Sequence, residues 1–120
     1  MVVVDLILAT ICFTMNSGGI EECHPILVGQ NTPKGEFILN KRITESIGYG
    51  GDVLQFKETS DGVFAIHRVY LLNPKEHRAE RLRSNDPANR KITFGCINVD
   101  SAVYNQLVDC CSRNYTILIK

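Results

Sequence analysis

The chain is organised around the stretch Ile92-Thr93-Phe94-Gly95-Cys96-Ile97-Asn98-Val99, in which a strand-like run leads into a single cysteine directly after a glycine. Glycine has no side chain, so the backbone can turn tightly there and leave space for a ligand. Backbone amides at such a turn can face a developing oxyanion. The stretch therefore predicts that Cys96 is a nucleophile. The alternative is a small buried hydrophobic residue, the usual role of an isolated cysteine.

A nucleophilic cysteine needs a base, because the thiolate is the reactive form and a free thiol with a pKa of ~8.5 is mostly protonated at neutral pH. The chain offers three histidines, His24, His67 and His77. His67 lies within an apolar run, Val63 to Leu71, where an imidazole is either satisfied by the backbone or directed into a site. His77 falls in a polar segment, and His24 precedes a proline without an evident partner. A helix expected from Asp100 onward would lower the thiol pKa through its N-terminus.

The composition is that of one globular domain covering residues 1–120. Apolar residues make up 44% and charged residues 22% of the chain, which excludes a disordered protein. Thirteen basic and thirteen acidic residues cancel, and aromatic residues are few, so nothing indicates nucleic-acid binding. The apolar residues 1–15 lack a positive start and a cleavage site, and they are too short to span a bilayer. We expect strands there, no membrane insertion, and no export signal of the usual kind.

Five cysteines are an odd number, so at least one is unpaired within the chain. If residues 17–18 form a hairpin loop, Cys12 lies opposite Cys23 at about 4.5–5.5 Å, within reach of a disulfide. Two reduced cysteines are the alternative. Cys110 and Cys111 are adjacent and therefore poorly placed to bridge each other. No Cys-x-x-Cys spacing occurs, so we expect no metal site.

Turn signals divide the chain into short strands. Turn formers at residues 16–19 and 59–62 stand between apolar or β-branched runs. We expect strands at residues 2–5, 6–15, 20–28, 36–41, 53–57, 63–71, 91–94 and 115–119. The glycine-rich stretch 43–51 is expected to connect strands or line a cleft.

Two helices are expected between these strands. Asn73 and Pro74 are typical of an N-cap and a first helical position, so a polar helix is predicted for residues 75–83. From Asp100 onward, Val103, Leu107 and further apolar positions recur at helical spacing. The sequence thus predicts a mainly antiparallel β domain with a helix packed near the cysteine.

Several of these segments resemble the L,D-transpeptidases, which are bacterial cell-wall enzymes. Residues 92–99 resemble their nucleophile motif, Ser/Thr-His-Gly-Cys followed by an apolar residue and Asn or Arg, with Phe94 in place of the usual histidine. Phe64-Ala65-Ile66-His67 resembles the strand that ends in the catalytic histidine. Thr32-Pro33-Lys34-Gly35-Glu36-Phe37 resembles a Thr-Pro-x-Gly-x-Phe segment, and residues 2–18 resemble the first two strands. The resemblance covers essentially the whole chain in order.

Two departures from the family pattern concern the base. Arg68 stands where Gly or Ser often follows the histidine, and residues 68–91 resemble a subgroup with a longer, arginine-rich insertion. The gap from His67 to Thr93 is longer than the gap between histidine and nucleophile motif in the commonest pattern, whereas His77 would give that shorter gap. We favour His67, because its strand context matches and a rigid strand holds a base better than an exposed helix does.

The resemblance implies a mainly β, L,D-transpeptidase-like β-sandwich with one or two short helices. It implies a cysteine acyltransferase without a cofactor. Cys96, activated by His67, would attack a peptidoglycan stem peptide beside its terminal D-alanine, and an amine acceptor would resolve the thioester. The amides of Gly95 and Cys96 would bind the oxyanion, and Thr93 and Asn98 would brace the turn or orient the histidine.

Stem peptides carry carboxylates, which arginine binds bidentately. The insertion supplies arginines that could bind these carboxylates. The alternative for most of them is a place on a solvent-exposed helix face without contact to substrate. We predict substrate contacts from Arg68, Phe94, Asn98, Arg81 and Arg90, with Arg78 and Arg83 as further candidates.

Two other functions stay open at this point. One is a secreted antibacterial effector with L,D-carboxypeptidase or D-amino-acid exchange activity on the same stems, accompanied by an immunity protein. The other is a catalytically inactive module that binds wall peptides, for which Phe94 is the motivation. All three functions imply the periplasm or cell envelope.

Overall fold

The computed structural model describes residues 1–15 and 19–120, and the predicted hairpin loop at Ser17 and Gly18 lies outside the described residues. The described chain is mainly β, as predicted. Its strands are β1 (Val2–Asp5), β2 (Thr10–Thr14), β3 (Glu21–Pro25), β4 (Val28–Gly29), β5 (Gly35–Ile43), β6 (Asp52–Thr59), β7 (Gly62–Arg68), β8 (Lys91–Thr93), β9 (Ile97–Val99) and β10 (Tyr115–Ile119). Its α-helices are α1 (Arg78–Leu82) and α2 (Ser101–Cys111).

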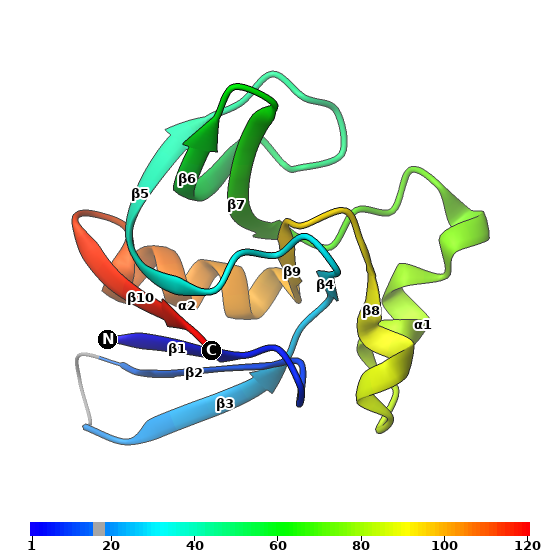
Figure 1. The fold of residues 1–120 in the computed structure, drawn as a ribbon, viewed down its shortest axis with the longest axis horizontal. Coiled ribbons are helices and arrows are strands. Elements are labelled where there is room, and N and C mark those ends of the chain that lie inside the picture. Colours follow the sequence, from blue (N-terminus) through cyan, green and yellow to red (C-terminus); the bar gives the residue numbers. More distant parts are fainter. Residues whose placement is uncertain (16–18) are drawn as a thin grey trace.

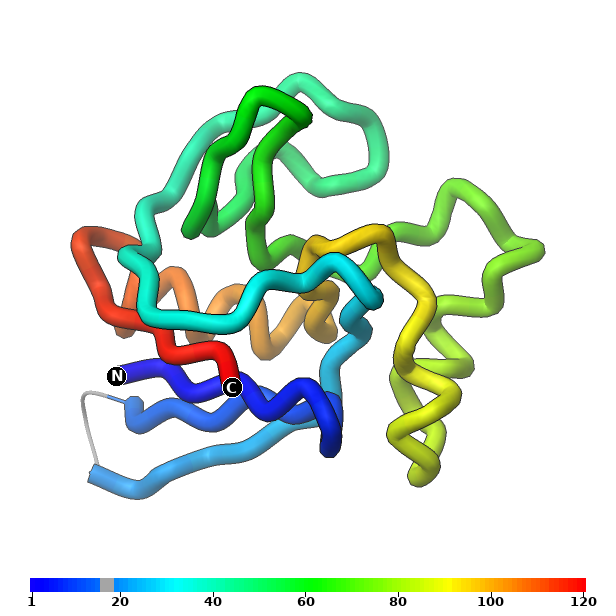
Figure 2. Tube along the Cα trace, in the orientation of Figure 1, coloured from blue at the N-terminus to red at the C-terminus, as the bar shows by residue number. Residues whose placement is uncertain are grey.

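The main sheet has the strand order β3-β2-β1-β10-β5-β6-β7-β9 and is bent through β5. Residues 35–39 of β5 pair with β10, whereas residues 40–43 pair with β6. In Figure 1 the half containing β1, β2, β3 and β10 lies below β5, and β6 and β7 lie above it. Figure 2 follows the same curved path of β5 along the trace. The bend folds one sheet into the predicted sandwich.

The core joins both halves of the sheet to α2. Asp100 caps this helix by accepting from the Ala102 amide, as expected of a short polar side chain at an N-cap. The apolar face of α2 is buried in the same cluster as strand residues from β1, β5, β7 and β10; its members from the helix are Val103, Tyr104, Leu107 and Cys111. The predicted amphipathic helix is therefore confirmed. No helix of the described residues is long and apolar enough to cross a membrane.

Three expected elements are interrupted in the structure. The strand predicted for residues 6–15 begins only at Thr10, because Asp5 accepts a hydrogen bond from Leu8 at 2.9 Å and closes a turn. The strand predicted for residues 20–28 is divided into β3 and β4. The helix predicted for residues 75–83 is split at His77, whose φ of 52° ends a 3₁₀ turn at Pro74–Glu76 before α1 starts.

The cysteines correct one expectation and resolve another. Cys12 pairs with Cys23 in the β2–β3 register, and the two form a disulfide. Cys110 and Cys111, expected not to bridge each other, are also joined, at the last two residues of α2. Cys96 is the free cysteine.

Arg90, predicted to contact substrate, instead holds the insertion onto the N-terminal half of the sheet. Its side chain is 5% exposed. The guanidinium donates to the carbonyls of Ala9 at 3.3 Å and Leu8 at 2.8 Å, and also to that of Ser84. One buried cation therefore satisfies carbonyl groups of the β1–β2 turn and of the loop after α1.

Replacing Arg90 with methionine should lower the free energy of unfolding by at least about 2 kcal/mol, because it leaves buried carbonyl groups without a hydrogen-bond donor. Urea denaturation would measure the change. The matched control is Arg83→Met on the exposed side of α1, where we expect a change within about 0.5 kcal/mol. Equal stability of the two variants would contradict the anchoring role of Arg90.

Candidate active site

The turn that carries Cys96 connects β8 and β9, and its successive carbonyl groups are all fixed by hydrogen bonds. The carbonyl of Phe94 accepts from the Asn31 amide at 3.2 Å, and that of Gly95 accepts from the Thr32 hydroxyl at 2.9 Å. The Cys96 carbonyl accepts from the Thr93 hydroxyl at 2.7 Å. Thr93 therefore braces the turn from within, and residues 29–32 brace it from outside.

These bonds determine where the amides of Gly95 and Cys96 point. In a trans peptide the N–H is directed opposite to the preceding C=O, and no cis peptide occurs in the described chain. Both N–H groups are therefore directed away from the 29–32 segment that binds the carbonyls. Neither amide has a backbone or side-chain acceptor among the described residues. Two fixed and unpaired donors beside a cysteine form an arrangement suited to an oxyanion.

Gly95 is required for a different reason than the sequence suggested. Its φ is not in the left-handed region, so the turn itself does not demand glycine. A Cβ at this position would collide with the ring of Phe64 on β7. The missing side chain therefore makes room for Phe64 rather than for a ligand.

His67 is the histidine that reaches this turn. β7 and β9 pair in parallel, with His67 opposite Asn98. The imidazole is 2% exposed, and its Nδ1 lies 2.7 Å from the Arg68 carbonyl. Because a carbonyl only accepts, Nδ1 must carry the proton and Nε2 must be the unprotonated nitrogen. Burial lowers the pKa of His67 to about 4, the Arg68 carbonyl partly opposes this, and the Arg78 charge lowers it further.

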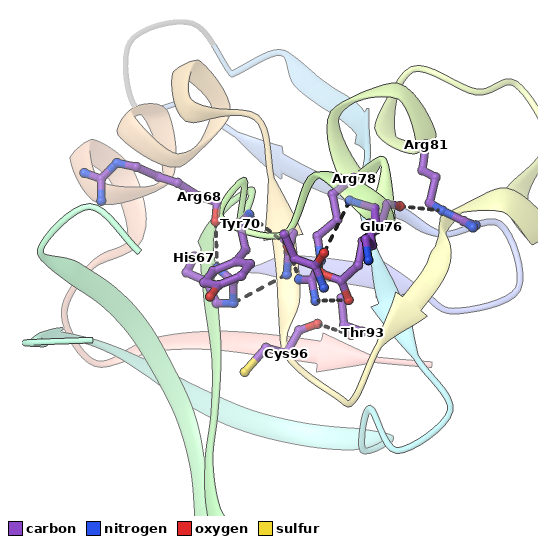
Figure 3. A network of polar contacts seen from close by, with 11 residues as sticks. His67, Arg68, Tyr70, Glu76, Arg78, Arg81, Thr93 and Cys96 are labelled. Atoms are coloured by element: carbon purple, nitrogen blue, oxygen red, sulfur yellow. Dashed lines mark hydrogen bonds and ion pairs between the residues drawn. The ribbon is translucent and has the colours of Figure 1, made fainter. Parts of the chain in front are cut away.

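Asn98 faces the unprotonated nitrogen of His67. Its Nδ2 lies 3.4 Å from Nε2. The Oδ1 atom accepts from Arg78 Nη1 at 2.9 Å and from the Tyr70 amide at 3.3 Å. Because both partners of Oδ1 are donors, the carboxamide is fixed with its NH₂ group toward the histidine. Figure 3 shows this chain of contacts running from His67 to Arg78 and Glu76.

The cysteine and the histidine open into one cavity. Its volume is about 510 Å³, and its lining includes Cys96, His67, Thr93, Phe94 and Gly95. The Cys96 sulfur has the Val63 carbonyl as its hydrogen-bond partner at 3.7 Å, so thiol and imidazole are not bonded to each other in this resting arrangement. Catalytic contacts are often loose before substrate binds.

The Cys96 thiol is protonated in the resting site, contrary to the effect expected from a helix N-terminus. β9 separates the cysteine from α2. Burial raises the pKa of Cys96, while the Ala65 amide and the Arg78 charge oppose the rise. Cysteine and histidine are thus both neutral, which fits general-base activation rather than a preformed ion pair.

The other predicted site residues are placed as follows. Arg68 points to the opposite face of β7, where it pairs with Asp52 at 3.0 Å and lies over the Tyr104 ring. Arg81 is bound to the backbone of Glu76 and Asn89. Phe94 lines the cavity and is 75% exposed. The structure therefore does not bring Arg68, Arg81 or Arg90 to the cavity.

The remaining histidines are remote from the cysteine turn. His77 is exposed beside Glu80, at 3.5 Å, and His24 lies on the edge strand β3 against Phe13. Neither lines the cavity. Among the described histidines, the structure thus brings only His67 to Cys96.

Sequence reasoning missed three residues that shape the site. The Thr32 hydroxyl binds the turn, although the segment around it had been singled out by resemblance. The Tyr49 ring covers the imidazole of His67 at a centroid distance of 4.2 Å, and it comes from the glycine-rich stretch expected to line a cleft. Glu76 holds Arg78 through both carboxylate oxygens at 3.0 and 3.3 Å. No sequence signal indicated this pair.

Comparison with solved structures identifies the architecture. An L,D-transpeptidase from Mycobacterium smegmatis superposes with a TM-score of 0.63 at 18% identity, covering 99% of this chain and 57% of that one. An Enterococcus faecium L,D-transpeptidase mutant gives a TM-score of 0.68 at 16% identity, with coverage of 99% and 48%. L,D-transpeptidase 3 from Mycobacterium tuberculosis gives 0.63 at 14% identity, with coverage of 99% and 60%.

The chain has an L,D-transpeptidase-like fold. It spans about half to three fifths of the length of these solved chains. No protein-family model and no curated protein matches the sequence. These structures confirm the L,D-transpeptidase-like fold predicted from the sequence. At sequence identities of 14–18% the similarity is one of fold.

The buried, neutral His67 should make the stability of this L,D-transpeptidase-like domain depend on pH. The folded pKa of about 4 lies below the ordinary value of 6.5, so between these values the unfolded chain binds a proton that the folded chain excludes. Stability should therefore fall as the pH drops through this window, by at most about 3 kcal/mol from this group. Urea denaturation of wild type and His67→Gln between pH 7 and pH 4 would isolate the contribution. Parallel curves would contradict it.

Gly95→Ala should destabilise the domain by about 1–3 kcal/mol, the usual range for overpacking, because the new methyl group meets the Phe64 ring. Phe64→Leu should remove part of that collision. We expect the double variant to lose less stability than the sum of the two single variants, which a double-mutant cycle by thermal or urea unfolding measures. Strict additivity would mean that Phe64 is not the reason for the glycine.

Proposed function

We propose that this chain is a cysteine acyltransferase acting on peptidoglycan stem peptides, with Cys96 as nucleophile and His67 as general base. The observation that carries the proposal is the tautomer of His67. Its Nδ1 donates to the Arg68 carbonyl, so Nε2 is the unprotonated nitrogen, and His67 and Cys96 line the same cavity. The L,D-transpeptidase-like fold supports it, because solved structures with this fold are named L,D-transpeptidases.

In the first step the Cys96 sulfur attacks the carbonyl carbon that links an L-centre residue to the terminal D-alanine. The single lone pair of His67 Nε2 faces Asn98 Nδ2 at 3.4 Å at rest, so this contact is given up when Nε2 takes the thiol proton. The imidazolium later returns that proton to the nitrogen of the leaving D-alanine as the C–N bond breaks. The product is a thioester on Cys96. The unpaired amides of Gly95 and Cys96 suit the negative charge that develops on the carbonyl oxygen.

In the second step an amine of another stem attacks the thioester carbonyl and releases the thiol. His67 Nε2 takes a proton from the amine, and a proton returns to the sulfur. Transfer to an amine makes the reaction an L,D-transpeptidation. If water resolves the thioester, the enzyme is an L,D-carboxypeptidase, and a free D-amino acid gives exchange.

The cavity offers charges of both signs for such a substrate. Lys57 lines it and suits a carboxylate, whereas Asp61 suits an ammonium group. Phe94 adds an exposed apolar contact at the rim. Asn98 is fully buried and holds His67 in place rather than reaching the substrate. We place the reaction in the periplasm or cell envelope, where the stems are found.

Acylation by a β-lactam tests the nucleophile. L,D-transpeptidase 3 from Mycobacterium tuberculosis has been solved with a faropenem-derived adduct. We expect intact-mass spectrometry to detect a faropenem adduct on the wild-type chain, mapped by peptide analysis to Cys96. Cys96→Ser should give no thioester adduct. His67→Gln should slow acylation by about 10²- to 10⁴-fold, the usual contribution of a general base.

His77→Asn is the matched control, since this histidine is exposed, does not line the cavity and has a left-handed backbone that asparagine tolerates. Its acylation rate should equal that of wild type. A folded wild-type chain that forms no adduct would contradict the proposal and favour a module that only binds wall peptides. Rapid acylation of His67→Gln would instead reject the assigned base.

Incubation with tetrapeptide stems then separates the reaction types. Cross-linked dimers indicate transpeptidation, tripeptides indicate L,D-carboxypeptidase activity, and exchanged termini require an added D-amino acid. Toxicity that appears only when the chain is directed to the periplasm, and that a co-encoded protein relieves, would identify an antibacterial effector.

A further inference from the structure

We propose that Arg78, clamped by Glu76, is a positioning residue that orients Asn98 and thereby keeps His67 in its basic, Nδ1-protonated form. The inference rests on the proposed function, because it concerns how the base of that reaction is prepared. Its structural content, a link from the insertion to the imidazole, is testable without any activity.

The first observation is that the Arg78 guanidinium is fixed by two neighbours, the Glu76 carboxylate and the Tyr70 ring. Nε and Nη2 bind the two carboxylate oxygens of Glu76 at 3.0 and 3.3 Å, and the side chain is 14% exposed. The guanidinium also lies 5.3 Å from the centroid of the Tyr70 ring. An arginine with a bidentate partner and an aromatic neighbour has little rotational freedom. The remaining nitrogen is thus aimed at one acceptor.

That acceptor is Asn98 Oδ1, at 2.9 Å from Arg78 Nη1. A carboxamide can rotate by 180° and exchange its oxygen and nitrogen at low cost unless its partners distinguish them. Here the cation does so together with the Tyr70 amide at 3.3 Å, because both groups can only donate. If Oδ1 were turned toward His67 instead, it would stabilise a proton on Nε2 and remove the base. The Arg78 contact prevents this arrangement.

The second effect of Arg78 is electrostatic. Its positive charge opposes a charged imidazole and favours a thiolate, so it lowers the pKa of both His67 and Cys96. The groups facing His67 are few: the Tyr49 ring above it, the Cys96 thiol in the cavity, and the Arg78–Glu76 pair beyond Asn98. Arg68 and Asp52 form their ion pair on the other face of β7.

The split at His77 explains how a polar insertion supplies this residue. The left-handed backbone of His77 interrupts the expected helix, so that α1 starts with Arg78 and the 3₁₀ turn before it carries Glu76. Both members of the clamp therefore come from the junction between two short helical segments. The arginine-rich insertion therefore contributes to the site through Arg78, which lines the cavity and donates to Asn98.

Nuclear magnetic resonance titration of the His67 imidazole tests the proposal directly. In the wild-type chain the nitrogen shifts should report the Nδ1-protonated tautomer and a pKa of about 4. In Arg78→Gln the pKa should move up toward the ordinary value, because the opposing charge is lost and Asn98 Oδ1 keeps only the Tyr70 amide as a donor. Arg78→Lys keeps the charge without the fork and should give an intermediate value. The matched control Arg83→Gln, an equal charge change on an exposed residue, should titrate like wild type.

Faropenem acylation supplies the kinetic counterpart. We expect Arg78→Gln to acylate about tenfold more slowly at neutral pH, the value of one charged hydrogen bond. In a plot of its acylation rate against pH, the fall on the acid side should move to higher pH. A purely structural loss would not cause this shift. If Arg78→Gln and Arg78→Lys keep the wild-type tautomer, titration and pH dependence of acylation, the positioning role is wrong. If the wild-type chain is not acylated at all, the proposed function fails, and the titration still decides the role of Arg78.

Discussion

The hydrogen bond from His67 Nδ1 to the Arg68 carbonyl, 2.7 Å long, is the interaction on which the site depends. It is made between adjacent residues of one strand, so it needs no loop to be ordered and no second side chain to be ionised. It fixes the tautomer and thereby leaves Nε2 as the unprotonated nitrogen. Burial of the ring keeps that nitrogen uncharged until a proton is delivered to it.

The cysteine turn has the complementary property that its donors are arranged before any substrate arrives. Thr32 and Asn31 hold the carbonyls of Gly95 and Phe94 from one side, and the adjoining amides are left for the other. Donors that are already oriented need no reorganisation when charge develops, which is the main advantage of a folded site over water. Packing of Phe64 against Gly95 prevents the turn from relaxing.

Much of this arrangement could be predicted from sequence because it is local. The strand Tyr115–Ile119 and the Asp100-capped helix follow from periodicity and capping, and the motif around Cys96 predicts the proposed nucleophile. The roles of the arginines could not be predicted, since they depend on contacts across long sequence distances. Arg90 bonds to Ala9, and Arg78 reaches Asn98 only because His77 adopts a left-handed conformation that no local rule requires.

The Cys12–Cys23 bridge has a further consequence for the cysteine that stays free. Any surroundings oxidising enough to close that hairpin also expose the Cys96 sulfur to the same oxidants. Oxidation of a thiol proceeds through its thiolate, and burial raises the pKa of Cys96 so that little thiolate is present at rest. A thiol that stays protonated at rest is therefore protected against sulfenic acid formation. The burial that keeps Cys96 neutral thus gives the chain chemical durability in the surroundings that its disulfide implies.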